Sequence, residues 1–159
     1  MSAPLVLGFD LRDTQKMEEV WPIISNTEAL RVNEAWAGDA GVLVASSDEE
    51  VVFQNCSWFN NDPCKHPAWM VWAKVLPPAP SGAYRVAALL MNNRDEPADV
   101  SVDWDTLDLK CPPHGGHVSC YVRDLWKHAA AGWFINGYTA RQLPSRDSAF
   151  IIVSTLATA

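Results

Sequence analysis

The chain has 159 residues, of which 48% are hydrophobic and 19% charged, and its formal net charge is −7. This length suits one domain, or one domain plus a fragment, with a sizeable core, and the composition excludes the intrinsically disordered and collagen-like classes. A negative surface repels phosphate backbones and no apolar run approaches the roughly 18 residues of a membrane span, so neither nucleic acid nor membrane is an expected partner.

The front of the chain, residues 1–36, has an α/β pattern. Residues 3–9 form a continuous apolar run, which is typical of a strand buried on both faces in a parallel sheet. Asp13 or Thr14 follows and can cap a helix, because either side chain can accept a hydrogen bond from a free backbone N–H group.

A helix is predicted after this cap from apolar residues at three- and four-residue spacing, namely Met17, Val20, Trp21 and Ile24. Pro22 inside the pattern disturbs the last turn, and a shorter turn or helix is expected to start at Asn26–Glu28. A lone strand–helix unit cannot bury its own apolar face. We therefore interpret residues 1–36 as the last strand and helix of something larger.

The apolar period changes to two from Gly41 onward, and turn signals such as Asn136–Gly137 separate short runs. The predicted strands are Val42–Ala45, Val51–Gln54, Met70–Val75, Tyr84–Met91, Val100–Trp104, Ser119–Asp124, Trp133–Tyr138 and Ala149–Thr155. About eight short strands without a helix among them predict an all-β fold, an antiparallel β-sandwich over residues 41–159.

Short segments taken in order along the chain match a known pattern. They are residues 2–12 (SAPLVLGFDLR), 29–34 (ALRVNE), 71–74 (VWAK), 81–90 (SGAYRVAALL), 102–104 (VDW) and 123–128 (RDLWKH). Together they resemble glycoside hydrolase family 27, the α-galactosidases and α-N-acetylgalactosaminidases, from the eighth strand of the (β/α)₈ barrel through the C-terminal β-sandwich. The resemblance implies that residues 1–36 are a barrel remnant.

The resemblance also implies a function for the parent enzyme, which is hydrolysis of terminal α-linked galactose with retention. Such enzymes use two carboxylates, and in this family both lie on earlier barrel strands that no residue of this chain matches. We therefore expect no catalytic residue and no cofactor here, and a chain that is inactive alone but supports the barrel. Asp10 ends the apolar run, where barrel active sites are built, but the family pattern implies a structural role for it.

Two further readings stay open. The sandwich could be a stand-alone module that binds a carbohydrate or a protein, or the barrel could be supplied in trans.

Self-association is also expected, unless the front of the chain folds onto the sandwich. Without barrel neighbours, an apolar strand edge would be exposed at Leu5, Val6, Leu7 and Phe9.

The beginning of the chain carries no basic segment followed by a long apolar one, so no signal peptide is visible. The location in the cell stays unknown, although the resemblance points to the secretory route, with a lysosomal, vacuolar or extracellular destination. Met1 is either the true start or an internal residue of a longer gene.

Four cysteines suggest two local disulfides, Cys56 with Cys64 and Cys111 with Cys120, each closing a short loop between strands. The competing interpretation is a zinc site of Cys111, His114, His117 and Cys120, whose residue types suit tetrahedral zinc although the spacing is tight.

The insertion between about Gln54 and Pro67 carries the remaining candidates. Asn55 begins an Asn-Cys-Ser pattern for N-glycosylation. Trp58, Phe59 and Trp69 flank the insertion and could stack on a sugar ring or form a small satellite core. Trp72, Trp104 and Trp126 lie on or next to predicted strands and are expected in the core.

Overall fold

The computed structural model describes residues 10, 12–54, 56, 62–114 and 116–156. These residues form two helices, α1 (Thr14–Ile24) and α2 (Thr27–Glu34), and eleven strands. The strands are β1 (Val42–Ser46), β2 (Glu50–Phe53), β3 (Cys64–Pro67), β4 (Trp69–Leu76), β5 (Arg85–Asn92), β6 (Ala98–Asp103), β7 (Pro113–His114), β8 (His117–Asp124), β9 (Ala129–Ile135), β10 (Gly137–Leu143) and β11 (Ser148–Ser154). The apolar run predicted as a barrel strand, residues 3–9, lies outside the described residues.

Both helices start where the capping residues predict. The Asp13 side chain accepts a hydrogen bond from the Lys16 backbone N–H, and Asn26 accepts from the N–H groups of Glu28 and Ala29. Each cap satisfies N–H groups that have no partner inside the helix. Within the described part of the chain, neither helix has the length and apolar character needed to cross a membrane.

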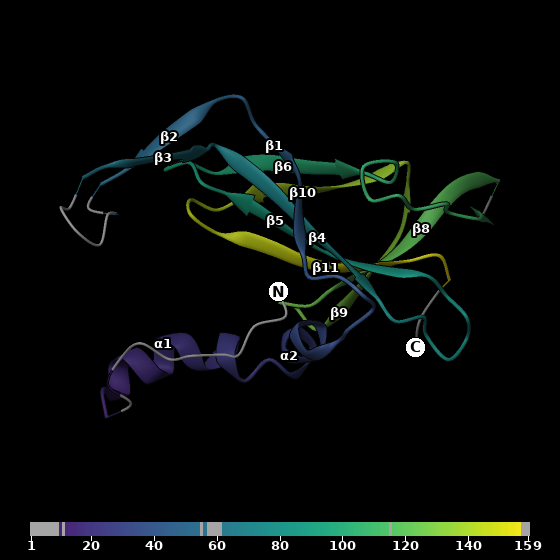
Figure 1. Cartoon of the computed structure of the whole chain (residues 1–159), viewed down its shortest axis with the longest axis horizontal. Coiled ribbons are helices and arrows are strands. Elements are labelled where there is room, and N and C mark those ends of the chain that lie inside the picture. Colours follow the sequence, from purple (N-terminus) through teal and green to yellow (C-terminus); the bar gives the residue numbers. More distant parts are fainter. Residues whose placement is uncertain (1–9, 11, 55, 57–61, 115, 157–159) are drawn as a thin grey trace.

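The described strands build an antiparallel sandwich, which confirms the predicted fold class. Seven of them form one sheet in the order β1-β4-β5-β11-β8-β7, with β9 also paired to β8, while β6 and β10 pair in a second layer and β2 and β3 form a separate hairpin. Figure 1 shows β6 and β10 on one side of the large sheet and both helices on the other. The central strands β4, β5 and β11 therefore lie inside a three-layer arrangement.

Two apolar clusters fill the spaces between these layers. The larger one, between the two sheets, includes Val71, Leu90, Val122 and Ile151, each fully buried. The smaller one lies on the helix side of the large sheet, and its buried members are Val32, Leu76, Ala87, Leu125 and Phe150. Because both faces of the central strands are covered, their sequences are nearly continuous apolar runs rather than strict alternations.

The predicted single strand Trp133–Tyr138 is wrong, because the chain turns inside it. β9 ends at Ile135 and β10 begins at Gly137, and Asn136 between them has a φ of 61°. A Cβ atom on Gly137 would lie 2.6 Å from the Val102 carbonyl oxygen, so this close approach of two strands requires glycine. The turn chemistry of Asn-Gly prevails here over the apolar pattern.

Other strands differ less from prediction. The short strands β3 and β7 were not predicted, since Cys64–Pro67 and Pro113–His114 carry proline and little apolar character. Of the three tryptophans expected in the core, Trp104 is 3% exposed, whereas Trp72 and Trp126 are only half-buried.

Candidate functional site

The candidate site is the side of the large sheet on which the two helices lie. Asn26 fixes the start of α2 to this sheet. Its side chain is buried, and while its oxygen caps the helix, its Nδ2 donates to the Leu125 carbonyl oxygen at 2.9 Å. One side chain therefore sets both where the helix begins and where it rests.

Glu28 adds a charged anchor in the first turn of the helix. Arg123 on β8 donates from Nε and Nη2 to the two carboxylate oxygens, at 2.5 and 2.9 Å, and His128 Nδ1 lies 2.9 Å from Oε1. The Glu28 side chain is 21% exposed and that of Arg123 is 34% exposed. The hydrogen bonds from Arg123, and secondarily those from His128, hold the pKa of Glu28 at about 2. This is a two-point arginine–carboxylate pair between a helix and a sheet that are 95 residues apart in sequence.

Lys74 on β4 fixes the other end of α2. Its ammonium donates to the carbonyl oxygens of Val32 at 2.7 Å and Asn33 at 3.2 Å, and the residue is 1% exposed. The last carbonyls of a helix lack intrahelical donors and carry partial negative charge, so a cation there is favourable. Burial nevertheless lowers the pKa of the Lys74 ammonium. Helix α2 is thus attached to the sheet at both ends.

Helix α1 has the opposite character. None of its residues Thr14–Ile24 is buried within the described structure, and Trp21 and Ile23 are each 56% exposed. Met17, Glu18, Trp21 and Pro22 line a shallow groove of about 310 Å³ to which only this helix contributes, among the residues described. Figure 1 shows α1 extending away from the sandwich. The side of α1 that carries Met17 and Trp21 is therefore not covered by any described residue of the sandwich.

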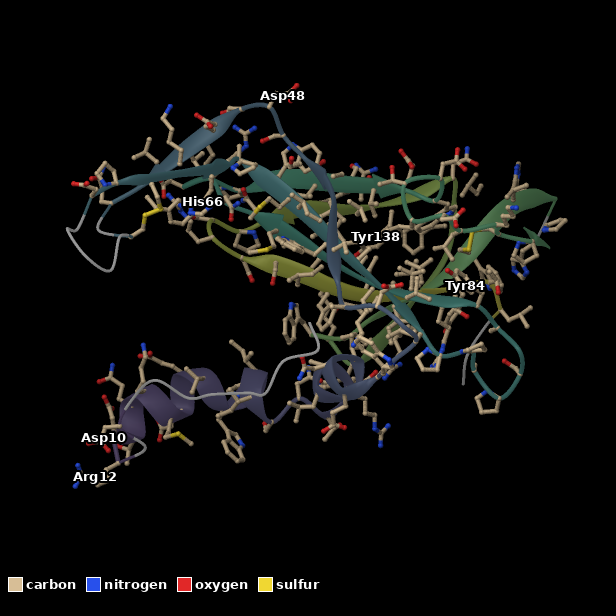
Figure 2. All side chains as sticks on the ribbon, viewed as in Figure 1. Asp10, Arg12, Asp48, His66, Tyr84 and Tyr138 are labelled. Atoms are coloured by element: carbon tan, nitrogen blue, oxygen red, sulfur yellow. A yellow bond between two sulfur atoms is a disulfide. The ribbon has the colours of Figure 1, made fainter. Side chains whose placement is uncertain are left out.

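A cleft of about 570 Å³ lies between the end of α1 and the adjoining ends of β8, β10 and β11. Pro22 and Ile23 form its helix wall, and Asp124, Trp126, Lys127 and Tyr138 are among the residues that line the sandwich side. This volume falls within the roughly 300–1,000 Å³ of small-molecule sites. Figure 2 places Tyr138 between the two layers of the sandwich.

The polar groups of this cleft are held in place by short contacts. The Asp124 carboxylate accepts from the Lys127 backbone N–H at 3.0 Å and pairs with the Lys127 ammonium at 2.9 Å. Desolvation, and then the negative charge of Asp124, raise the pKa of the Tyr138 hydroxyl. The Trp126 indole donates to Ser148 Oγ at 3.3 Å, and its ring lies 5.4 Å from that of Phe150.

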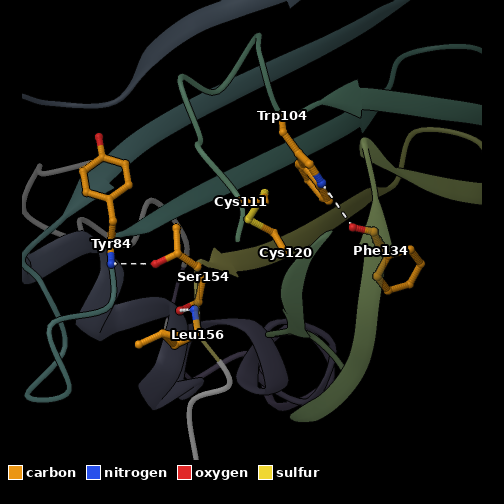
Figure 3. Close-up of a disulfide and its surroundings, with 8 residues drawn as sticks. Tyr84, Trp104, Cys111, Cys120, Phe134, Ser154 and Leu156 are labelled. Atoms are coloured by element: carbon orange, nitrogen blue, oxygen red, sulfur yellow. Dashed lines mark hydrogen bonds between the residues drawn. A yellow bond between two sulfur atoms is a disulfide. The ribbon is translucent and has the colours of Figure 1, made fainter. Parts of the chain in front are cut away.

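The two predicted disulfides are confirmed. Cys56 is bonded to Cys64 and Cys111 to Cys120, with Cα atoms 5.9 and 5.1 Å apart. Figure 3 shows the second bond near Trp104, whose indole donates to the Phe134 carbonyl oxygen at 3.2 Å.

The zinc interpretation loses its two sulfur ligands to this bond, because a disulfide sulfur is not a thiolate. His114 instead stacks on Trp133 with ring centroids 3.9 Å apart. Among the described residues, Cys56, Cys64 and His66 bring possible metal-binding atoms within 4.8 Å of one another, but both sulfurs are again in a disulfide.

The other predicted site residues are scattered. Asn55, Trp58 and Phe59 lie outside the described residues. Trp69 is half-buried and packs against the larger apolar cluster. Asp10 is exposed and pairs with the neighbouring Arg12 at 2.8 Å, which lowers the pKa of the Asp10 carboxyl.

Sequence reasoning missed the anchors of α2 and the cleft. Lys74 carries a visible signal, since it is the single charged residue inside the apolar run Trp69–Leu76. No local sequence pattern predicts the other contacts, because they join distant parts of the chain. These are the ion pair of Glu28 with Arg123 and the proximity of Asp124 to Tyr138 in the cleft.

Comparison with known proteins gives a consistent result. The family model described as "Alpha galactosidase C-terminal beta sandwich domain" matches residues 67–153. Alpha-galactosidase 3 of Arabidopsis thaliana is 29% identical over 147 residues, which are 92% of this chain and 27% of that protein.

Solved structures agree on the fold. Alpha-galactosidase I from Mortierella vinacea has a TM-score of 0.64 at 20% identity, covering 96% of this chain and 32% of that one. A GH27 β-L-arabinopyranosidase from Geobacillus stearothermophilus, solved with arabinose, has a TM-score of 0.58 at 17% identity, over 86% and 24% of the two chains. The chain thus spans about a third or less of the length of these relatives.

Proposed function

Because the chain belongs to the alpha-galactosidase C-terminal beta-sandwich domain family, we propose that it is the supporting C-terminal part of a retaining α-galactosidase-like hydrolase. The catalytic barrel, in the same polypeptide or as a separate subunit, hydrolyses terminal α-linked galactose. The two carboxylates that such a reaction needs belong to that barrel. This chain alone is inactive, and it holds the barrel's last helix against a rigid sandwich.

The exposed apolar side of α1 is the observation that carries this proposal. Trp21 is more than half exposed, and Met17, one turn before it, lines the same groove. Only Ser25 and Asn26 separate this helix from the anchored α2. An apolar surface that no described residue outside the helix covers is typical of an interface with another protein body. The relatives, which are about three to four times longer than this chain, support a barrel as that body.

The first experiment is an activity assay of the 159-residue chain with p-nitrophenyl α-galactoside. We expect no turnover above that of buffer. Turnover that scales with chain concentration, and survives further purification, would overturn the proposal.

The second experiment is sequencing of the transcript upstream of the first codon, together with the neighbouring genes. We expect a (β/α)₈ barrel that supplies the two carboxylates, either in frame or as a separate gene. If neither contains a barrel, the support role fails.

A stand-alone carbohydrate-binding module is the second candidate function, and the cleft beside Trp126 and Tyr138 is what favours it. This candidate requires that no barrel exists in cis or in trans and that the chain is retained on a galactose resin. Retention by the chain, combined with a barrel upstream, would instead indicate a sugar site within the enzyme.

A further inference from the structure

We propose that the cleft between α1 and the ends of β8, β10 and β11 is a second, non-catalytic site for a neutral pyranose ring. The inference rests on the proposed function for the class of sugar, a galactoside, but it assigns that sugar to a place outside the catalytic barrel. The site consists of Trp126, Tyr138, Asp124 and Lys127, opposite the helix wall of Pro22 and Ile23.

The first argument is the combination of flat and polar groups around one cavity. A pyranose ring has an apolar face of C–H groups and a rim of hydroxyl groups, so its sites combine an aromatic ring with hydrogen-bonding side chains. Trp126 and Tyr138 both line the cleft. The contacts of Trp126 with Ser148 and Phe150 hold the indole in place, and the Tyr138 ring is held by Phe134, 5.0 Å away between ring centroids. A preformed wall spares the ligand part of the ordering cost.

The second argument is the hydrogen-bonding capacity that the fold leaves unused. Asp124 accepts two hydrogen bonds, both from Lys127, although a carboxylate can accept about four. The Lys127 ammonium, whose side chain is 77% exposed, uses one of its three donors on Asp124. The Tyr138 hydroxyl has no hydrogen-bond partner among the described residues. Donors and acceptors therefore remain for a ligand's hydroxyl groups.

The third argument is the charge of the lining, which identifies the ligand as neutral. The cleft carries two acidic residues, Asp124 and Asp147, and two basic ones, Lys127 and Arg141. An anionic or cationic ligand would meet as much repulsion as attraction, whereas a hydroxyl group can donate to the acids and accept from the cations.

The fourth argument is position. Pro22 lines both this cleft and the exposed groove of α1, so the cleft lies next to the surface proposed to meet the barrel. Small-molecule sites occur preferentially at such junctions between domains. A sugar unit bound there would hold a branched substrate near the catalytic lobe without taking part in the reaction.

The test is titration of the ¹⁵N-labelled chain with methyl α-D-galactopyranoside, with the indole N–H signals of the tryptophans as reporters. We expect saturable shifts of the Trp126 signal, assigned from Trp126→Phe, and no shift with glycerol at equal hydroxyl concentration. Absence of a shift up to 100-fold molar excess and into the tens of millimolar, about the weakest useful affinity, overturns the inference. An equal response to glycerol also overturns it.

Matched variants locate the binding. Tyr138→Phe and Lys127→Gln are each expected to weaken binding about fivefold, the effect of one lost hydrogen bond. Tyr84→Phe and Lys16→Gln, outside the cleft, are expected to leave it unchanged. If the cleft variants bind as tightly as the original chain, the sugar lies elsewhere.

The outcome is separable from that of the proposed function. If a longer enzyme hydrolyses α-galactosides but the Trp126 indole signal does not shift with the sugar, the second site is refuted and the proposed function stands. If the Trp126 signal shifts with the sugar but no barrel is encoded in cis or in trans, the support role is refuted and the sugar site stands.

Discussion

Replacing Glu28 with Gln is expected to lower the free energy of unfolding, because it weakens the attachment of α2 to the sheet. The pKa of this carboxyl is lowered from 4.5 to about 2, and each pKa unit corresponds to about 1.4 kcal/mol. The ionised group therefore contributes at most about 3 kcal/mol to the free energy of unfolding. Because Arg123 is about one-third exposed, solvent screens the pair, and we expect a loss of about 1–2 kcal/mol for Glu28→Gln.

The pH dependence of this loss has a defined sign. A carboxyl whose pKa is lowered by folding stabilises the folded chain above its unfolded pKa, here 4.5, and loses that contribution as the pH falls through the folded pKa of about 2. The difference between the original chain and Glu28→Gln should therefore be full at pH 7. At pH 3 it should be less than half as large.

The assay is urea denaturation followed by tryptophan fluorescence at pH 7 and pH 3. Glu34→Gln is the matched control, since Glu34 is exposed at the other end of the same helix, and it should change stability by less than about 0.5 kcal/mol. Equal losses for both variants, or a loss for Glu28→Gln that is as large at pH 3 as at pH 7, would refute the reasoning.

Three other changes test separate parts of the structure. Lys74→Met should lower the free energy of unfolding by about 1–3 kcal/mol, because the Val32 carbonyl loses its donor in a buried place; an unchanged urea midpoint would contradict this. The double change Cys111→Ser with Cys120→Ser opens a loop with a sequence separation of 9 and should cost about 2.5 kcal/mol. Calorimetry checks it, and a melting temperature equal to that of the intact chain would count against it. Trp21→Ser should reduce any self-association seen by sedimentation velocity, since it removes the largest exposed apolar group of α1; unchanged association would place the contact elsewhere.

The sequence was most informative where local chemistry decides the structure. Asp13 and Asn26 predicted both helix starts, because capping depends on one side chain and the next three N–H groups. The positions of seven strands, β1, β2, β4, β5, β6, β8 and β11, followed from the apolar period and the turn signals. The error at Asn136 arose because four apolar or aromatic residues around it favoured one continuous strand, while the close approach of Gly137 to Val102 depends on tertiary structure.

The site could be predicted only in part, for a physical reason. Each disulfide joins cysteines that are eight or nine residues apart, so loop closure itself suggested the pairs. The cleft joins Pro22 to Asp124 and Tyr138, and no rule of spacing relates residues more than a hundred positions apart. The resemblance to a family predicted the sandwich but gave no information about its unused polar groups.

The attachment of α2 bears on how this sandwich could be transplanted onto a different catalytic lobe. A graft that begins at Gly41, where the strand pattern starts, would remove Val32 and Asn33. The Lys74 ammonium would then lose the two carbonyl oxygens to which it donates on the helix side of the sheet. Fusion points ahead of Asn26 carry the helix along with its receptor surface. The junction that matters for swapping lobes thus lies about fifteen residues before the one that a strand map would suggest.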